Sequence, residues 1–289
     1  MKIVVIGASG FLGTKLFNFL SKNHEVIGTY SDNKKEGLMH LDATIPGDIK
    51  KFLNDNKPDI VIDTIALTSS VACEKNPDLC RRLNYETAKN ILEACKTINS
   101  VMVFFSSTYI FDGKKGNYNE SDLPNPENEY GKTKVLAEKE ILSYKNSIVI
   151  RVDAMYGYNG KGEKNGVFGG SILSGNEVKL KAPDQMRQPV LADDVVSAIL
   201  FILKKNQRGL FHVAGPTRVK MIDFLKSLEK VVRDESKISS IQTNEKSEIE
   251  MKIPFNTTLD ISKIENLGLK THSFEEGLEI LRNQYNKDK

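Results

Sequence analysis

The sequence predicts an α/β fold built on a doubly wound parallel sheet, with a smaller C-terminal lobe. Short β-branched apolar runs alternate with amphipathic helical segments along the first 150 residues, which is the pattern of parallel strands joined by right-handed helical crossovers. A glycine-rich segment, Gly7–Gly13, separates the first apolar run from the first helical segment. The chain of 289 residues with 39% hydrophobic residues can bury a core of this size. We therefore expect a Rossmann-like arrangement.

The expected elements follow in order from the N-terminus. Lys2–Ile6 is a strand because it is a short β-branched run that stops at Gly7, and Phe11–Leu20 is a helix because its leucines share one stripe. The same two patterns then repeat. They predict strands at Glu25–Thr29, Asp59–Asp63, Val101–Ser106 and Ile148–Val152, and helices at Ile49–Asn54, Pro77–Thr97 and Tyr130–Ser143.

The pattern changes after Arg151. Residues Tyr156–Gly175 contain 7 glycines and are expected to form a loop region that lines a site. Regular elements then return as helix Asp193–Lys204, strand Gly209–Ala214, and helices Met221–Arg233 and Ser273–Tyr285. We assign residues 1–150 and about 190–215 to the sheet lobe, and residues about 151–189 and 216–289 to the smaller lobe.

Charge and cysteine usage narrow the class of partner. Lys and Arg number 41 against 38 Asp and Glu, a net charge of +3 without charged blocks, so we expect a small-molecule partner and no nucleic acid. No apolar stretch suits a signal peptide or a membrane span, which predicts a cytoplasmic protein without a membrane partner. Cys73, Cys80 and Cys95 lack metal-ligand spacing, so we expect buried thiols, with neither a bound metal nor a disulfide.

The segment Gly7-Ala8-Ser9-Gly10-Phe11-Leu12-Gly13 has glycine spacing typical of a dinucleotide-binding turn. Missing side chains let backbone N–H groups approach a pyrophosphate, and the N-terminus of the following helix adds positive potential. The position between the first strand and the first helix strengthens this interpretation over that of a merely tight turn. The sheet lobe is therefore expected to bind NAD(P).

The end of the second strand bears on the choice of cofactor. An acidic residue there would bind the ribose 2′-hydroxyl of NAD(H), but the chain has Tyr30 and Ser31, with Lys34–Lys35 close behind. This pattern favours NADP(H). Asp32 would serve NAD(H) if the strand ended two residues later, so NAD(H) stays an alternative. Asp42 suits either a contact with the adenine amine or a turn cap.

Tyr130 and Lys134 are spaced for acid–base chemistry. Residues four apart on a helix project from one face, so the Lys134 ammonium is expected beside the Tyr130 phenol. A fixed cation would lower the phenol pKa toward neutrality and fit the tyrosine for proton transfer. The alternative is a helix start with a solvated lysine.

Several motifs in order resemble one family, the extended short-chain dehydrogenase/reductases, and within it the dTDP-4-dehydrorhamnose reductase-like group. The resemblance spans nearly the whole chain. The motifs that carry it are Gly7–Gly13, Asp59–Ala66 with Thr68 and Glu74 after it, Asn84, Ser106–Gly113, Tyr130–Lys134, Arg151–Gly157 and Gln185–Asp194.

The resemblance implies a set of site residues. The catalytic residues would be Ser107, Tyr130 and Lys134, with Thr108 as the alternative hydroxyl, because the chain reads Ser106-Ser107-Thr108 where the family usually reads Ser-Thr-Asp. Thr108 and Tyr109 replace the acidic pair of related dehydratases, which argues against water elimination. Cofactor contacts would come from Gly7, Ser9, Gly10, Phe11, Leu12, Gly13, Tyr30, Ser31, Asp42, Ala43, Ala66, Asn84, Tyr130 and Lys134. Substrate contacts would come from Thr68, Val71, Ser107, Thr108, Arg151, Tyr156 and Arg187.

The implied activity is that of an NADP(H)-preferring oxidoreductase of deoxysugar biosynthesis, which reduces a 4-keto-6-deoxy sugar nucleotide with Tyr130 as proton donor. One alternative is an NAD-dependent sugar-nucleotide epimerase. Another is a non-catalytic, NADP-binding regulatory subunit resembling the methionine adenosyltransferase β subunit. A homodimer is also considered. Asp193 and Asp194 are expected to be first-turn charges of a helix.

Overall fold

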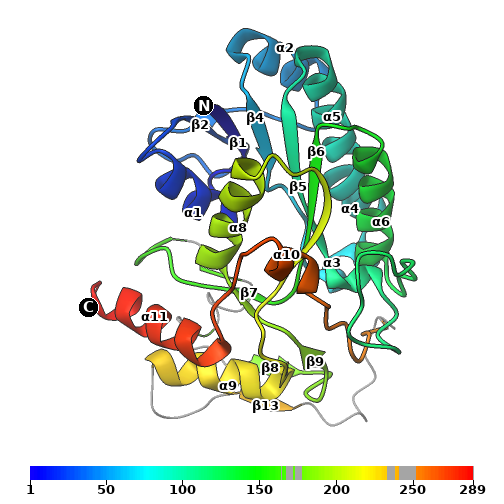
Figure 1. Cartoon of the computed structure of the whole chain (residues 1–289), viewed down its shortest axis with the longest axis vertical. Helices are drawn as coiled ribbons and strands as arrows, with labels where there is room; N and C mark the ends of the chain where they lie inside the picture. Colours follow the sequence, from blue (N-terminus) through cyan, green and yellow to red (C-terminus); the bar gives the residue numbers. More distant parts are fainter. Residues whose placement is uncertain (164, 167–171, 173–177, 233–237, 241–251, 289) are drawn as a thin grey trace.

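A seven-stranded parallel sheet forms the centre of the protein, which we describe from a computed structural model (Figure 1). The structure describes residues 1–163, 165–166, 172, 178–232, 238–240 and 252–288. The strand order is β11-β6-β5-β4-β1-β2-β3, so the order reverses between β1 and β4. The predicted fold class is confirmed. The strands are β1 (Lys2–Ile6), β2 (Glu25–Tyr30), β3 (Met39–His40), β4 (Ile60–Asp63), β5 (Val101–Ser107), β6 (Ser147–Val152) and β11 (Gly209–Val213).

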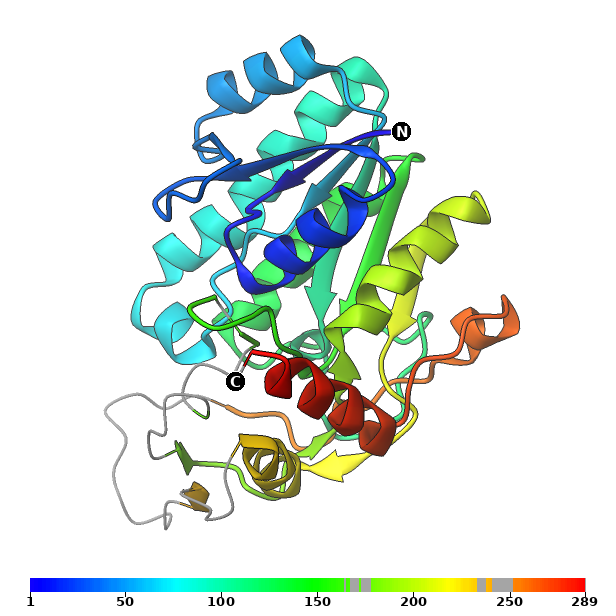
Figure 2. The same cartoon turned by 90° about the vertical axis from the view of Figure 1, so that its left-hand side faces the viewer.

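Helices cover both faces of this sheet (Figures 1 and 2). In β1, Ile3 and Val5 face one core and Val4 and Ile6 face the other, because successive side chains of a strand point to opposite sides. The first core includes residues of α1 (Phe11–Leu20) and α8 (Ala192–Lys204). The second includes residues of α2 (Pro46–Asn56), α5 (Thr87–Ile98) and α6 (Glu129–Leu142).

The long helix predicted at Pro77–Thr97 is divided into three parts. It consists of α4 (Pro77–Arg81), a π-helical turn (Arg82–Glu86) and α5. The turn places Asn84 with no exposed surface in contact with the loop after β4. Because a π-bulge cannot be read from 3.6-residue periodicity, the sequence did not reveal it.

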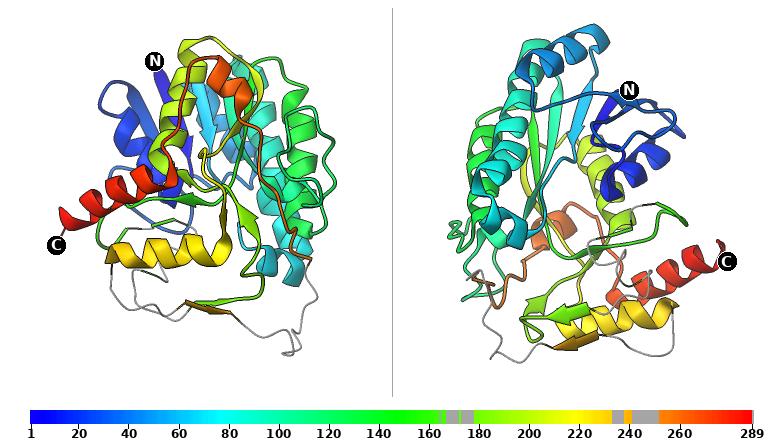
Figure 3. Two further views of the ribbon diagram at one scale, coloured as in Figure 1. Left: turned by 60° about the horizontal axis from the view of Figure 1, so that its bottom comes forward. Right: turned by 180° about the vertical axis from the view of Figure 1, so that it is seen from behind.

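A smaller lobe lies beyond the carboxyl ends of the central strands (Figure 3). Its core joins aromatic and aliphatic side chains of α9 (Met221–Val232) and α11 (Phe274–Asn286) with Tyr156. Short pairings accompany it, namely β7 (Met155–Tyr156) with β10 (Val190–Leu191), β9 (Met186–Arg187) with β12 (Val219–Lys220), and β8 (Val178–Leu180) with β13 (Ile238–Ser240).

One part of the predicted smaller lobe packs on the sheet instead. Leu259 and Ile261, together with Ile264 of α10 (Ser262–Asn266), belong to the first core of the sheet. The Leu259 N–H donates to Gln188 Oε1 at 2.7 Å. This long-range contact draws the chain back to the sheet before α11 begins.

The cysteine prediction is wrong for two of the three residues. Cys73, in α3 (Ser70–Lys75), forms a disulfide with Cys80 in α4. The chain breaks its helix at Asn76, whose side chain caps α4, and the turn brings the two Cα atoms to 5.0 Å, within disulfide range. Cys95 is a buried free thiol, as expected.

The disulfide predicts a measurable contribution to stability. Replacing Cys73 and Cys80 together by serine should lower the free energy of unfolding by about 2–3 kcal/mol, because the crosslink restricts a short loop of the unfolded chain. Urea unfolding of both proteins measures the difference. Mass spectrometry after alkylation under denaturing conditions provides the control: two further labels should appear only after reduction, and three labels without a reductant would contradict the bridge.

Among the residues that the structure describes, no helix is long and apolar enough to cross a membrane, and no cluster of potential metal ligands is present.

Candidate active site

The glycine-rich segment forms a tight turn between β1 and α1. Gly7 has a φ of 82°, a left-handed conformation that glycine adopts without strain. A Cβ on Gly13 would collide with the Gly7 carbonyl oxygen and lie 2.8 Å from Ala8 Cα. Gly10 is the N-cap of α1 and has no side chain to bond the first N–H groups. The turn therefore keeps backbone donors available for an anion at the helix N-terminus.

This geometry predicts the effect of Gly13→Ala. The methyl group would push Gly7 and Ala8 away from α1 and displace the proposed anion-binding turn, so NADPH affinity should fall about 100-fold, equivalent to about 2.7 kcal/mol. Fluorescence titration with NADPH measures it. Gly47→Ala is the matched control because a Cβ there meets nothing within 4 Å. Equal affinity in the Gly13 and Gly47 variants would contradict the proposed role of the turn.

At the end of β2, Tyr30 packs edge-on against His40, with ring centroids 5.5 Å apart, while Ser31 and Asp32 are exposed. Of the two lysines that could contact a 2′-phosphate, Lys35 forms an ion pair with Glu163 at 2.6 Å. Lys34 is exposed. Ser31, Asp32 and Lys34 are therefore all exposed polar residues just after β2.

The two candidate residues after β3 are held by a local turn. Asp42 Oδ1 accepts hydrogen bonds from the N–H and hydroxyl of Thr44, at 2.9 and 2.6 Å. Ala43 is buried in the second core. Of the two interpretations of Asp42, the turn cap is the one that the structure displays.

Ser107 and Thr108 have different surroundings at the end of β5. The Thr108 side chain is fully buried and donates to Asp153 Oδ1 at 3.0 Å, while the Thr257 hydroxyl contacts it at 3.1 Å. Ser107 is half-buried, and its hydroxyl accepts a hydrogen bond from the Tyr109 N–H at 3.2 Å. Ser107 is therefore the hydroxyl that remains accessible.

Tyr130 is the second residue of α6, the helix that carries the predicted acid–base pair. Asn128 caps this helix: its Oδ1 accepts a hydrogen bond from the Gly131 N–H at 2.9 Å. The cap fixes the start of the helix and so the position of Tyr130. Burial raises the pKa of the Tyr130 phenol to about 12, and the neighbouring Ser107 hydroxyl opposes this rise. The predicted lowering of this pKa is therefore wrong: the phenol stays protonated at neutral pH.

Lys134 lies on the same helix but reaches toward the sheet. Its side chain is 2% exposed, and its ammonium donates to the Phe105 carbonyl at 2.8 Å. Burial lowers the pKa of Lys134 to about 8, while Asp63 and then Glu138 raise it. The alternative of a solvated lysine is thus contradicted, although the ammonium contacts the sheet in place of the phenol.

Asn84 holds the loop that follows β4. Its Oδ1 accepts from the Leu67 N–H at 2.7 Å and its Nδ2 donates to the Leu67 carbonyl at 3.1 Å. This pair of bonds fixes the backbone between the half-buried Ala66 and the exposed Thr68. Val71, on α3, is 37% exposed. Thr68 and Val71 can therefore meet a ligand, whereas Asn84 positions the loop.

The structure does not bring Arg151 to the site, so this substrate prediction is wrong. Arg151 is 3% exposed and donates to both carboxylate oxygens of Glu138, at 2.9 and 2.7 Å. Its Nη1 lies 3.3 Å from His212 Nε2. The alternation of β6 directs Arg151 onto the face covered by α6, where Glu138 neutralises it.

The side chains of Arg187 and Tyr156, which were predicted to contact the substrate, are buried and packed against other residues. Arg187 is 8% exposed, forms an ion pair with Asp153 and stacks over the Tyr109 ring at 5.3 Å. Tyr156 lies in the core of the smaller lobe, edge-on to Phe224. Sequence reasoning missed Asp153, although a carboxylate just after a central strand could have signalled it. The Arg187 guanidinium still borders Tyr109 near the phenol of Tyr130.

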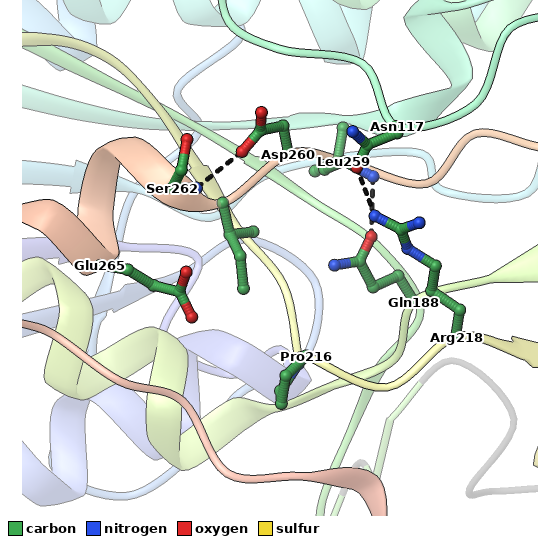
Figure 4. A pocket seen from close by; sticks show the side chains of 9 residues that line it. Asn117, Gln188, Pro216, Arg218, Leu259, Asp260, Ser262 and Glu265 are labelled. Atoms are coloured by element: carbon green, nitrogen blue, oxygen red, sulfur yellow. Dashed lines mark hydrogen bonds between the residues drawn. The ribbon is translucent and has the colours of Figure 1, made fainter.

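A separate polar hollow of about 270 Å³ lies near α10 (Figure 4). Its Arg218 is bonded to Asn117, and its Asp260 accepts from the Ser262 N–H at 2.8 Å. None of the predicted site residues lines it. The chemistry-bearing side chains gather instead at the carboxyl ends of β4 and β5.

The fold and the site together define an α/β protein of the extended short-chain dehydrogenase/reductase class. The reversal of strand order between β1 and β4, beside the Gly7–Gly13 turn, is where such sheets bind dinucleotides. The chain belongs to the RmlD substrate binding domain family, whose model matches residues 1–286.

Curated relatives of two kinds are similar to the chain. A probable low-salt glycan biosynthesis reductase of Haloferax volcanii is 26% identical, covering 97% of this chain and 97% of the relative. The methionine adenosyltransferase 2 subunit beta of Rattus norvegicus is 25% identical, covering 93% and 83%. Family membership is therefore compatible with both a reductase and a subunit of another enzyme.

Solved structures share the fold over nearly the whole chain. A hypothetical dTDP-4-dehydrorhamnose reductase from Sulfolobus tokodaii has a TM-score of 0.81 at 30% identity, covering 95% of this chain and 98% of the other. A dTDP-4-dehydrorhamnose reductase from Bacillus anthracis, crystallised with NADP, has a TM-score of 0.85 at 23% identity, covering 98% and 99%.

Proposed function

We propose that this protein is an NADP(H)-preferring reductase of a 4-keto-6-deoxy sugar nucleotide. The observation that carries the proposal is that the half-buried Ser107 hydroxyl, at the end of β5, neighbours the Tyr130 phenol of α6. A ketone reductase needs a proton donor at the oxygen that becomes an alkoxide, together with a second hydrogen-bonding group there. The family and the Haloferax reductase support the same class of reaction.

The cofactor fits the residues present, because the Gly7–Gly13 turn packs so closely on α1 that Gly13 has no room for a Cβ, and because α1 begins without a side-chain cap. The N–H groups of the α1 start would hold the pyrophosphate, and Lys134 would hold the nicotinamide ribose. When bound, NADPH supplies the hydride. Ser31 and Lys34 are the polar groups proposed to contact the 2′-phosphate. The preference for NADP(H) is also supported by the Bacillus anthracis structure, which was crystallised with NADP.

Within this proposal each side chain has a separate task. Tyr130 delivers its proton to the carbonyl oxygen of the sugar. Its raised pKa keeps the phenol protonated, and therefore neutral, at neutral pH. Ser107 donates a hydrogen bond to the same oxygen. Thr68, Val71 and the Tyr109–Arg187 pair border the space proposed for the sugar and its diphosphate. The ion pair with Asp153 fixes the orientation of the Arg187 guanidinium against the Tyr109 ring.

The direct test is oxidation of NADPH and NADH, followed at 340 nm, with dTDP-4-keto-6-deoxy-L-mannose generated in place from dTDP-glucose. Turnover that depends on the sugar nucleotide, faster with NADPH, is expected. A panel with other nucleotides and other 4-keto sugars follows as the control for substrate identity. Tight NADPH binding without turnover on any ketone of this panel would overturn the reductase proposal.

The second candidate is a regulatory subunit that binds NADP, and the similarity to the methionine adenosyltransferase 2 subunit beta favours it. The two candidates differ in one respect that can be measured. A subunit should co-elute with a methionine adenosyltransferase from its own cell extract and change its kinetics, whereas a reductase should turn over as purified.

A further inference from the structure

A polar group that the proposed reaction does not use lies beneath Lys134. Asp63 ends β4 and is the register partner of Phe104 on β5, so the two side chains leave the sheet on the same face. The Lys134 ammonium lies 4.5 Å from the centroid of the Phe104 ring. Ser106, two residues beyond Phe104, points to that face as well. Asp63, Ser106 and Lys134 therefore lie on the same face of the sheet, the face that α6 covers.

Each of these groups has hydrogen-bonding capacity to spare. Asp63 is 2% exposed; its Oδ1 accepts from the Ile65 N–H at 2.9 Å, but its Oδ2 has no partner in the described part of the chain. Ser106 is 2% exposed and its hydroxyl also lacks a partner there. Lys134 has three N–H donors and one hydrogen bond, to the Phe105 carbonyl. A buried ammonium and a buried carboxylate that lack hydrogen-bond partners are each unfavourable alone.

We propose that Asp63 is a positioning residue, whose buried carboxylate is the counter-ion that keeps Lys134 in its ammonium form and directs it along the sheet. The proposal rests on the proposed function for its consequence, because Lys134 must be charged to hold the cofactor ribose. Asp63 itself needs to touch neither cofactor nor substrate.

The other ionisable groups around the pair do not replace Asp63. Glu138 also raises the pKa of Lys134, but it is held by Arg151 through two hydrogen bonds. Cys95, on α5, remains a thiol because burial and then Asp63 raise its pKa. Tyr130 is protonated at neutral pH. Burial raises the pKa of Asp63 to about 6, with Lys134 opposing, and Lys134 titrates near 8, so both are charged between about pH 6 and 8.

The test is a lysine titration by NMR with ¹³Cε-labelled lysine, in which the Lys134→Met variant identifies the Lys134 resonance. In Asp63→Asn the midpoint of Lys134 should move to lower pH by about one unit or more, since the nearby opposite charge is gone. Asp59→Asn is the matched control, because this exposed aspartate directly precedes β4, at the end of the strand opposite Asp63, and its carboxylate accepts from the Lys2 N–H. An unchanged Lys134 midpoint in a folded Asp63→Asn variant would overturn the proposal.

Two further readouts keep the test decisive. If Asp63→Asn fails to fold, the reciprocal measurement applies: the Asp63 carboxyl, followed by ¹³Cγ, should titrate at higher pH in Lys134→Met, and an unchanged value there overturns the pairing. As the pH rises, NADPH affinity should begin to decline at a lower pH in Asp63→Asn than in the wild type, because Lys134 loses its proton earlier. A shifted Lys134 midpoint with no ketone turnover in the wild type would reject the proposed function and leave the pair intact.

Discussion

Replacing Tyr130 by phenylalanine is expected to lower kcat by about 10²–10⁴-fold, the contribution of a positioned general acid. The phenol is the proton donor of the proposed reaction, and its raised pKa keeps the proton in place. The ring and its edge-on contact with Tyr109 remain, so NADPH affinity should stay within about twofold, less than about 0.5 kcal/mol. Steady-state kinetics and a fluorescence titration measure the two quantities.

Tyr144→Phe is the matched control, because this tyrosine donates to the Ser100 carbonyl at 3.0 Å, near the amino end of β5 and away from the site. Its kcat should equal that of the wild type. Retention of more than about a tenth of kcat in Tyr130→Phe, a loss of under about 1.4 kcal/mol, would assign the proton transfer to another group.

Replacing Arg151 by methionine is expected to lower the free energy of unfolding by about 3–5 kcal/mol, because the change leaves Glu138 as an uncompensated buried charge. The two side chains are 3% and 4% exposed. Urea unfolding measures the loss. For the folded fraction, KM for the sugar nucleotide should remain unchanged, since the guanidinium faces α6 and not the cleft.

Two variants control this experiment. Replacing both partners, as Arg151→Met with Glu138→Leu, should recover much of the lost stability because no charge then remains buried. Lys132→Met removes an exposed ion pair with Glu129 on the same helix and should cost less than about 1 kcal/mol. A raised KM with unchanged stability in Arg151→Met would restore Arg151 to the substrate site.

Local patterns account for most of the fold that the sequence predicts. The β-branched run at Lys2–Ile6 and the leucine stripe of Phe11–Leu20 appear with the predicted bounds, because period-2 and period-3.6 patterns reflect burial of one face. The Gly7–Gly13 turn follows for a similar reason, since its steric requirement lies within seven residues. The four-residue spacing likewise places Tyr130 and Lys134 on one helix.

Contacts between distant residues were beyond the reach of these patterns. The sequence alone determined the order of elements, the glycine-rich turn and the helix that carries Tyr130 and Lys134. Only the tertiary structure decided that Glu138 pairs with Arg151, that Cys73 bonds to Cys80, and that Asp63 and Lys134 share one face of the sheet. The physical reason is that a charge or a thiol has no periodic signature, so its partner and its pKa depend on which elements pack against it.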